Sequence, residues 1–152
     1  MRIALYQPDI AGNVGTILRT AACFGIAVDI IEPCGFAFSE RALRRAGMDY
    51  AAVAAVTRHG GWDAYCAARK GQGRLVLMTT AGATPLPRFA FRPDDHLLMG
   101  SESAGVPSHV HDAADARVVI PLRSGFRSLN VAVAAGIAIA EALRQTEGFA
   151  PC

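Results

Sequence analysis

The sequence predicts an α/β domain with a mainly parallel sheet flanked by helices. The expected strands are unbroken apolar runs, which is typical of strands that are covered on both faces. These runs alternate along the chain with segments of helical periodicity. The chain has 152 residues, of which 52% are hydrophobic, so we expect one domain spanning 1–152 with a sizeable core.

The first strand is expected at Arg2–Tyr6 (RIALY), a short apolar run that Pro8 ends. Residues 12–15 (GNVG) then read as a turn because two of the four are glycine. The next segment, Thr16–Phe24, has its apolar residues at helical spacing. Gly25 is placed to end that helix.

A second strand is expected at Ala27–Ile31 (AVDII), which Pro33 closes. Residues 39–47 begin with Ser-Glu and end with glycine, which is typical of a capped helix. Ala51–Val56 is expected as a further strand. Trp62–Arg69 is expected as a helix.

Three apolar runs in the second half of the chain are expected as strands: Arg74–Met78, Leu97–Met99 and Arg117–Ile120. Polar, glycine-bearing loops lie beside strands at Gln7–Gly15, Gly100–Pro107 and Pro121–Ser128. Ligands of open α/β sheets bind outside the carboxyl ends of the strands. The three loops are therefore expected to meet and to form one pocket.

The last apolar segment begins at Leu129 and shows β-branched residues two apart, as a strand would. Alanines fill the intervening positions, and the segment continues without a break into Glu141 and Arg144. Its length of about 16 residues exceeds that of a typical strand, so we expect a helix. Ser128 or Asn130 can cap it. Because it is apolar on nearly all sides, burial on more than one face is expected, either in a crowded core or at a dimer interface.

The charge balance is nearly even, with a net charge of +2. Lys70 is the single lysine among 15 basic residues, so a role with nucleic acid must come from local groups of arginines. The four cysteines lack metal-ligand spacing and are expected as free thiols: Cys23, Cys34, Cys66 and Cys152. His109 and His111 are expected as surface residues of a loop, and no metal site is predicted.

The sequence begins without the pattern of a signal peptide, and no apolar run approaches the roughly 20 residues that span a bilayer. We therefore expect a cytoplasmic protein with no membrane partner. Neither a dinucleotide fingerprint nor a P-loop is present. GSESAG does not satisfy the nucleophile-elbow pattern at Ser101 or Ser103, which leaves a serine hydrolase as the lesser alternative. A pocket with apolar walls and glycine backbone suits a nucleoside.

Taken together, these segments resemble the SPOUT methyltransferases, and within them the small tRNA wobble-position 2′-O-methyltransferases. The resemblance covers almost the full length. It is carried by LYQPDIAGNVGTILRTA, IIEPCGFAFSERALRRAGMDY, LMGSESAGVP and IPLRSGFRSLNVAVA. The middle block is the most specific to this subfamily.

The resemblance implies a C-terminal trefoil knot and S-adenosylmethionine as the cofactor. The residues expected to bind the cofactor are Met78, Gly100, Ile120 and Ser128. The expected catalytic residues are Arg19, Asn13, Glu102 and Asn130. Because a guanidinium holds its proton tightly, positioning of the ribose hydroxyl or a phosphate is the easier role for Arg19.

The expected substrate is the anticodon stem-loop of tRNA, methylated at cytidine or uridine 34. Arg41, Arg44 and Arg45 are expected to contact its backbone, and a solvated helix face is the alternative for these three. A homodimer is expected, with the first and last helices at its interface.

Two other functions are compatible with the sequence. The family usually has a basic residue where this chain has Ala104, which allows a non-catalytic, RNA-binding knot protein. A SPOUT enzyme acting on rRNA is the other alternative, although the chain lacks the RNA-binding extension at its N-terminus. A further departure is the apolar Val131, Ala132 and Val133 after the S-L-N motif, where polar residues are common.

Overall fold

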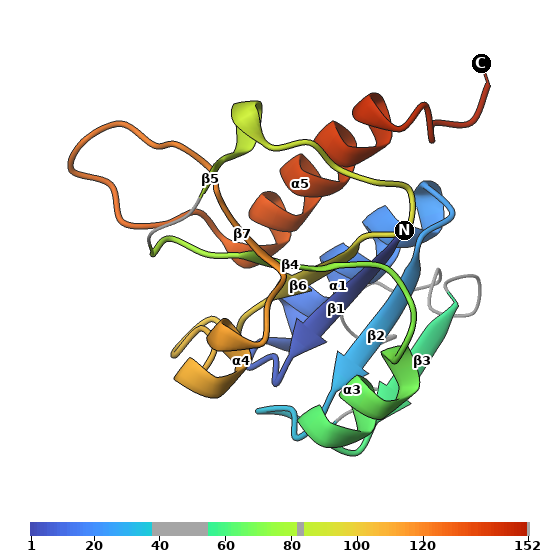
Figure 1. Ribbon diagram of the computed structural model, residues 1–152. Coiled ribbons are helices and arrows are strands. Elements are labelled where there is room, and N and C mark those ends of the chain that lie inside the picture. The colour runs from blue at the N-terminus through green and yellow to red at the C-terminus, as the bar shows by residue number, and fades with distance from the viewer. Residues whose placement is uncertain (38–54, 82–83, 152) are drawn as a thin grey trace.

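A seven-stranded parallel sheet organises the computed structural model, which describes residues 1–37, 55–81 and 84–151 (Figure 1). The strand order is β3-β2-β1-β6-β4-β7-β5, and every neighbouring pair is parallel, so the predicted parallel sheet is confirmed. The strands are β1 (Arg2–Tyr6), β2 (Ala27–Ile31), β3 (Val56–His59), β4 (Leu75–Met78), β5 (Thr84–Pro85), β6 (His96–Met99) and β7 (Ala116–Val119).

Helices cover both faces of this sheet. They are α1 (Ala11–Cys23), α3 (Trp62–Arg69), α4 (Ser108–Asp112) and α5 (Val131–Gln145), with a short 3₁₀ helix, η2 (Leu86–Arg88). The helices α1 and α5 lie side by side on one face, and α3 and α4 pack on the other (Figure 1). None of the described helices combines the length and the apolar character needed to cross a bilayer.

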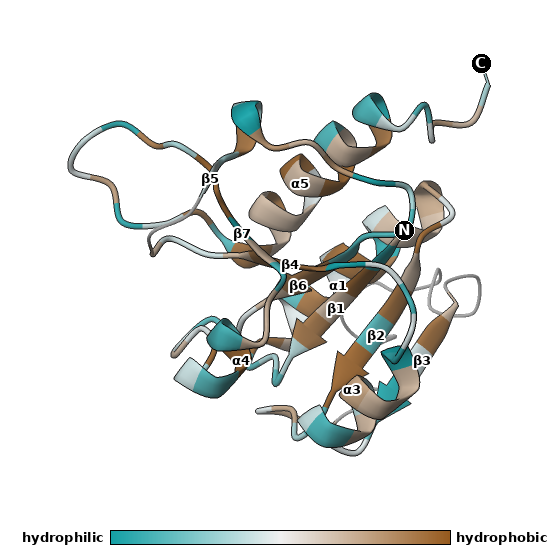
Figure 2. Ribbon diagram, viewed as in Figure 1, coloured by the Kyte–Doolittle hydropathy of each residue, from teal (hydrophilic) through white to brown (hydrophobic). Residues whose placement is uncertain are grey.

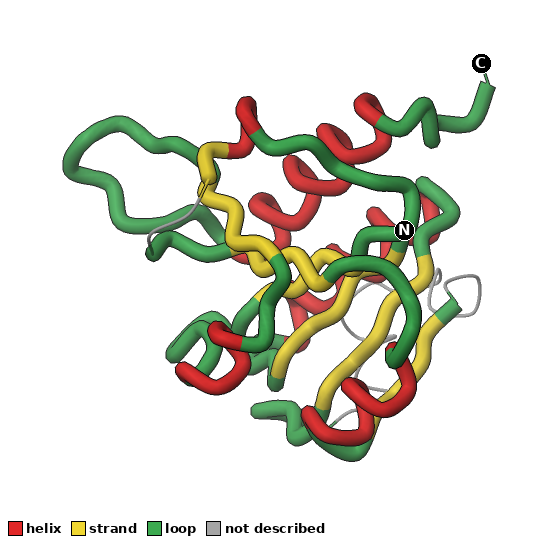
Figure 3. The backbone as a smooth tube through the Cα atoms, viewed as in Figure 1, coloured by secondary structure: helices red, strands yellow, loops and turns green. Residues whose placement is uncertain are grey.

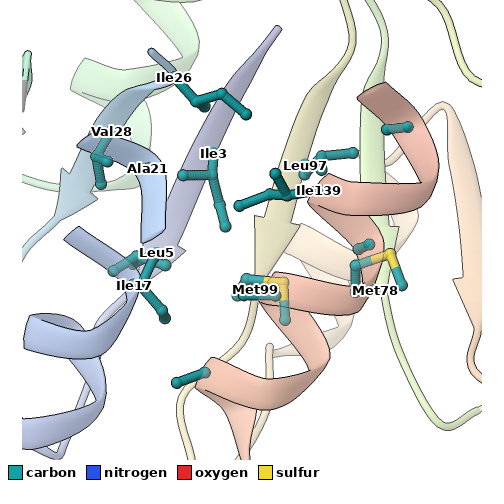
Figure 4. Packing of buried hydrophobic residues seen from close by; sticks show 14 of the residues in the cluster. Ile3, Leu5, Ile17, Ala21, Ile26, Val28, Met78, Leu97, Met99 and Ile139 are labelled. Carbon is teal, nitrogen blue, oxygen red and sulfur yellow. The ribbon is translucent and has the colours of Figure 1, made fainter. Parts of the chain in front are cut away.

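The two layers of helices receive alternate side chains of each strand, as the pleat of a strand dictates. Ile3 and Leu5 of β1 pack with residues of α1 and α5 in the larger core cluster (Figure 4). Ala4 and Tyr6 of the same strand pack in a second cluster that includes Tyr65 of α3. The strands β1 and β2 are largely hydrophobic in Figure 2, as expected of strands that are covered on both faces.

The helix α1 begins earlier than the sequence predicts. The turn expected at residues 12–15 is wrong, because these residues form the first turns of the helix. Ile10 has an extended backbone, and its carbonyl accepts hydrogen bonds from the amides of Asn13 (3.1 Å) and Val14 (3.2 Å). The weak helix propensity of glycine is overridden here by tertiary packing, since Gly15 is buried. Gly25 follows the helix with a φ of 66°, as a helix-ending glycine should.

Several other boundaries differ from expectation. The strand expected at Ala51–Val56 meets the observed β3 at Val56 alone, and residues 51–54 lie outside the described part of the chain. The helix expected at residues 39–47 also lies outside it. The sequence did not predict β5, η2 or α4. Because α4 carries His109 and His111, their placement in a loop is wrong.

The apolar C-terminal segment is a helix, as predicted. Asn130 is its N-cap, with the side-chain oxygen accepting from the amides of Ala132 (2.8 Å) and Val133 (3.3 Å). Burial on more than one face is wrong within a single chain, because Val133 is 52% and Ile137 37% exposed. A crowded core on all sides is therefore excluded.

A group of ionisable side chains is buried on the α3 side of the sheet. Arg2 donates from Nε to Asp29 Oδ2 (2.7 Å) and from Nη2 to Oδ1 (2.9 Å), and His59 Nε2 lies 2.8 Å from that Oδ1. Burial opposes ionisation of Asp29, but the hydrogen bonds from Arg2 and His59 outweigh it and lower the pKa of this carboxyl. Nearby, Tyr65 Oη lies 3.3 Å from His96 Nδ1, and burial lowers the pKa of His96.

We predict a specific pH dependence of stability from His96. Its folded-state pKa lies below the ordinary value of 6.5, so the unfolded chain binds this proton more readily. The stabilisation is fully present above about pH 6.5 and is lost as the pH falls below it. The urea midpoint, measured at fixed protein concentration, should fall between about pH 7 and about pH 5, and less so in His96→Gln. The exposed His109→Gln is the control; an equal fall in all three proteins would refute the assignment.

Candidate nucleoside pocket at the carboxyl edge of the sheet

A cavity of about 530 Å³ opens beyond the carboxyl ends of the central strands β4, β6 and β7. Its residues come from strand ends, from the loops that follow them, shown in green in Figure 3, and from the first turns of α1 and α5. The lining comprises Ile10, Asn13, Leu77, Met78, Thr79, Thr80, Met99, Gly100, Ser101, Glu102, Gly105, Val106, Val118, Ile120, Leu122, Ser128, Leu129, Asn130, Val131 and Ala134. This is the edge where an open α/β sheet binds its ligands.

The three predicted loops do meet in this cavity. Gln7–Gly15, Gly100–Pro107 and Pro121–Ser128 each contribute lining residues, so the expected convergence is confirmed. All four residues expected to bind a cofactor line the cavity: Met78, Gly100, Ile120 and Ser128. Their roles stay predictions.

Asn13 joins the three loops through its side-chain amide. Its Nδ2 donates to Glu102 Oε1 (2.9 Å), and its Oδ1 accepts from Asn130 Nδ2 (2.9 Å). Asn130 in turn caps α5 with its own oxygen. Three of the predicted catalytic residues thus form one hydrogen-bonded chain that crosses the cavity wall.

A second set of contacts links the first two loops. Glu102 Oε2 accepts from the backbone amide of Asp9 (2.8 Å), and Asp9 Oδ2 accepts from the amide of Ser103 (2.9 Å). The side-chain and backbone hydrogen bonds from Ser103 lower the pKa of Asp9. Glu102 lines the cavity, and Asp9 lies on the neighbouring loop that Glu102 contacts.

The loop after β6 closes on itself through a tight turn. The amides and carbonyls of Ser101 and Gly105 pair reciprocally at 2.9 Å, and Gly105 has a φ of 67°. A Cβ on Gly100 would lie 2.7 Å from the carbonyl carbon of Gly105, so the turn requires glycine there.

The same turn bears on the hydrolase alternative. The Ser101 hydroxyl donates to the Gly105 carbonyl (3.2 Å) and accepts from the amide of Ala104 (3.3 Å). In the described part of the chain it has no hydrogen bond to a histidine. Because a serine nucleophile needs such a base, the geometry disfavours a hydrolase.

The chemistry of the cavity is mostly neutral. Among the described residues that line the cavity, Glu102 is the one with an ionisable side chain, and both of its oxygens accept hydrogen bonds. Within residues 1–37, 55–81 and 84–151, no group of three histidine, cysteine or acidic side chains is placed to hold a metal ion. A largely apolar cavity of this size with a few convergent polar groups fits a nucleoside.

The cavity does not account for the remaining predicted residues. Arg19 is exposed on α1 and does not line the cavity of its own chain. Arg41, Arg44 and Arg45 lie outside the described residues. The sequence analysis missed three apolar lining residues, although an apolar side chain isolated among polar loop residues was a readable signal: Ile10, Leu122 and Leu129.

Comparisons with known proteins agree with one another. Residues 1–140 match the SpoU rRNA Methylase family. A protein of Beijerinckia indica subsp. indica named tRNA (cytidine(34)-2'-O)-methyltransferase is 57% identical over 149 residues, covering 97% of this chain and 93% of that protein.

Two solved structures are also similar. One, described as structural insights into the 2-OH methylation of C/U34 on tRNA, has a TM-score of 0.89 and 38% identity, covering 95% of this chain and 94% of that one. An AdoMet-bound rRNA methyltransferase from Sinorhizobium meliloti has a TM-score of 0.83 and 30% identity, covering 94% of this chain and 55% of that one.

We predict that Asn13→Ala loosens both neighbouring loops. Each lost hydrogen bond is worth about 1 kcal/mol, so amides in residues 100–107 and 121–130 should exchange roughly fivefold faster with deuterium. Hydrogen-exchange mass spectrometry measures this. Thr16→Ala, on the same helix, is the matched control. If exchange in both loops were as slow in Asn13→Ala as in the wild type, the bridge would have no structural effect.

Proposed function

Because the chain belongs to the SpoU rRNA methylase family, we propose that it uses S-adenosylmethionine to methylate the ribose 2′-oxygen of nucleotide 34 in tRNA. The observation that carries the proposal is the single cavity into which three separate loops bring the expected cofactor-binding residues. The relative that is 57% identical and bears the name of this activity supports it along 97% of the chain. We further propose that residues 1–152 form one catalytic domain. We propose that it acts in the cytoplasm, because its proposed substrate, tRNA, is found there.

The cavity suits the nucleoside part of the cofactor. Met78, Ile120 and Ser128 would hold it by apolar contact and by their backbone, and Gly100 leaves room because it has no side chain. When bound, the cofactor supplies an electrophilic methyl group on its sulfonium. Glu102 is the ionisable residue among the described lining residues, and its carboxylate favours a cationic centre nearby.

The residues of the chain must orient the ribose hydroxyl and help its proton to leave. We propose that the hydrogen bonds linking Glu102, Asn13 and Asn130 fix the shape of the cavity wall against which the ribose lies. Arg19 is proposed to bind the hydroxyl or an adjacent phosphate, because a guanidinium donates hydrogen bonds and does not act as a base. Since Arg19 does not line its own chain's cavity, we propose that it acts in the site of a partner protomer.

A homodimer through α1 and α5 would bring Arg19 to such a site. The two helices lie side by side (Figure 1). Apolar side chains are exposed on α5, where Val133 is 52% and Ile137 37% exposed, and just before α1, where the N-cap residue Ile10 is 50% exposed. Exposed aliphatic residues on adjoining helices are typical of an interface between copies. The small alanines of α5 allow close approach of a second backbone.

The contacts around α5 support the proposed trefoil knot. Gln145, at the end of α5, donates to the carbonyl of Phe89 (2.9 Å) and accepts from the amide of Phe91 (2.9 Å). The segment between η2 and β6 therefore lies against the C-terminal end of α5. The two pass close together in Figure 1. We propose that α5 threads through the loop that this segment closes.

The substrate proposal extends to the anticodon stem-loop, with Arg41, Arg44 and Arg45 on its backbone. Of the two other functions, action on rRNA is disfavoured by the degree of similarity, since this chain is 30% identical to the Sinorhizobium rRNA enzyme but 57% identical to the tRNA-modifying relative. A non-catalytic RNA-binding protein is separated by calorimetry with S-adenosylmethionine, since only the enzyme needs to bind it.

The proposed activity is tested by methyl transfer from labelled S-adenosylmethionine to total tRNA, followed by mapping of the methylated nucleotide. The wild type should modify position 34, and Arg19→Ala should lower kcat roughly a hundredfold, the usual effect of losing one electrostatic donor. Lys70→Ala, at the opposite edge of the sheet, is the control. Full activity of Arg19→Ala would remove its role, and methylation at other positions alone would overturn the substrate.

The proposed dimer is tested on α5. Ile137→Asp places a charge in the apolar interface, so we predict monomers in analytical ultracentrifugation and loss of methyl transfer. Asp63→Lys, an exposed change on α3 across the sheet, should remain dimeric and active. A dimeric, active Ile137→Asp protein would move the interface away from α5.

A further inference from the structure

The loop between β7 and α5 carries an aromatic side chain with no cover. Every residue from Pro121 to Asn130 is exposed, and Phe126 is 73% exposed, the highest value among the large hydrophobic side chains of the described chain. The loop projects from the body of the molecule, seen in orange in Figure 1 and in green in Figure 3. A phenylalanine in this position contributes nothing to the core, so its ring is available to another molecule.

The backbone of the loop presents this ring in a defined way. Gly125 has a φ of 93°, a conformation that a side chain would strain. The amide of Phe126 donates to the carbonyl of Arg123 (3.3 Å), which closes a turn at the tip. Leu122 and Ser128, on either side of the tip, line the cavity, so the ring is carried at the mouth of the pocket.

The charge around the mouth points to the partner. The loop before α1 contributes Asp9 and the loop after β6 contributes Glu102, and neither of these loops contains a cation. The segment after β4, residues 79–85, contains no charged residue. Arg123 and Arg127 are therefore the cations that the pocket-forming loops offer, and they flank Phe126. In the described part of the chain their guanidinium groups make no hydrogen bond or ion pair.

We propose that Phe126 is a stacking platform for an unpaired base of the RNA substrate, and that Arg123 and Arg127 bind the phosphates on either side of that base. The inference rests on the proposed function and names the element that recognises the RNA loop. An RNA loop offers splayed bases with flat faces and a polyanionic backbone. An aromatic ring between two arginines matches both, and stacking tolerates any base.

The stacking is tested with an anticodon stem-loop RNA and three variants of Phe126. Phe126→Ala should raise the Kd for RNA by roughly five- to a hundredfold, the range for loss of one stacked base. Phe126→Tyr should bind like the wild type, whereas Phe126→Leu, which keeps an apolar side chain without a ring, should bind like Phe126→Ala. The Kd for S-adenosylhomocysteine should be unchanged in all three.

The stacked base is identified with abasic nucleotides placed singly along the RNA loop. At one position the abasic RNA should bind the wild type as weakly as intact RNA binds Phe126→Ala, and the two changes together should add nothing. For the arginines, Arg123→Ala and Arg127→Ala should each lower the slope of log K against log salt by about 1, while Lys70→Ala leaves it unchanged.

The outcomes separate this inference from the proposed function. RNA affinity that is equal in wild type and Phe126→Ala would overturn the platform, even if position 34 is methylated normally. A lower affinity of Phe126→Ala for S-adenosylhomocysteine with unchanged RNA affinity would also overturn it, because the ring would then cover the cofactor. If the wild type fails to methylate tRNA, the proposed function fails, while the RNA affinities of the variants still decide the role of Phe126.

Discussion

The amide of Asn13 is the contact on which the shape of the pocket depends. A carboxylamide has a donor and an acceptor on one planar group, so it can satisfy Glu102 on one side and Asn130 on the other. An aspartate would repel Glu102, and an apolar residue would remove the partner of Glu102 Oε1 and of Asn130 Nδ2. Because Asn130 uses its oxygen to cap α5, its Nδ2 is free to donate to Asn13. The start of one helix, the cap of another and the loop after β6 are thereby fixed together.

The bridge is possible because the sheet brings its three loops to one edge. All strand pairs are parallel, so the chain leaves β1, β6 and β7 at the same edge of the sheet. These strands lie close together, because β1 pairs with β6 and only β4 separates β6 from β7. Helices cover both faces of the sheet, so ligands reach it at the carboxyl ends of the strands, where the polar backbone of the loops is open to water. The polar loop from Pro121 to Ser128 is exposed to solvent, and the apolar helix that follows it is in contact with the sheet. The loop forms the pocket mouth, while α5 packs on the sheet.

Much of this arrangement follows from local sequence. The strands β1, β2, β4, β6 and β7 are confirmed because their apolar runs reflect burial on both faces, and α5 is confirmed because alanines outweigh the β-branched residues between them. The convergence of the loops follows from the rule for parallel sheets. The start of α1 does not, because residues 12–15 have turn-like composition and become helical through contacts of Asn13 and Gly15 made by distant segments. The exposure of one face of α5 could not be predicted either. The segment is apolar on nearly all sides, so its sequence does not show which face packs on the sheet.

We propose that this pocket serves a cofactor, a second protomer and an RNA loop together. In this proposal the three loops bind the nucleoside of S-adenosylmethionine in the cavity of about 530 Å³. A crystal structure with S-adenosylhomocysteine tests it most directly. The account predicts the adenosine within contact distance of Met78, Gly100, Ile120 and Ser128, with the Asn13 bridge intact. A ligand bound at another face, or loops held apart around an empty cavity, would contradict it.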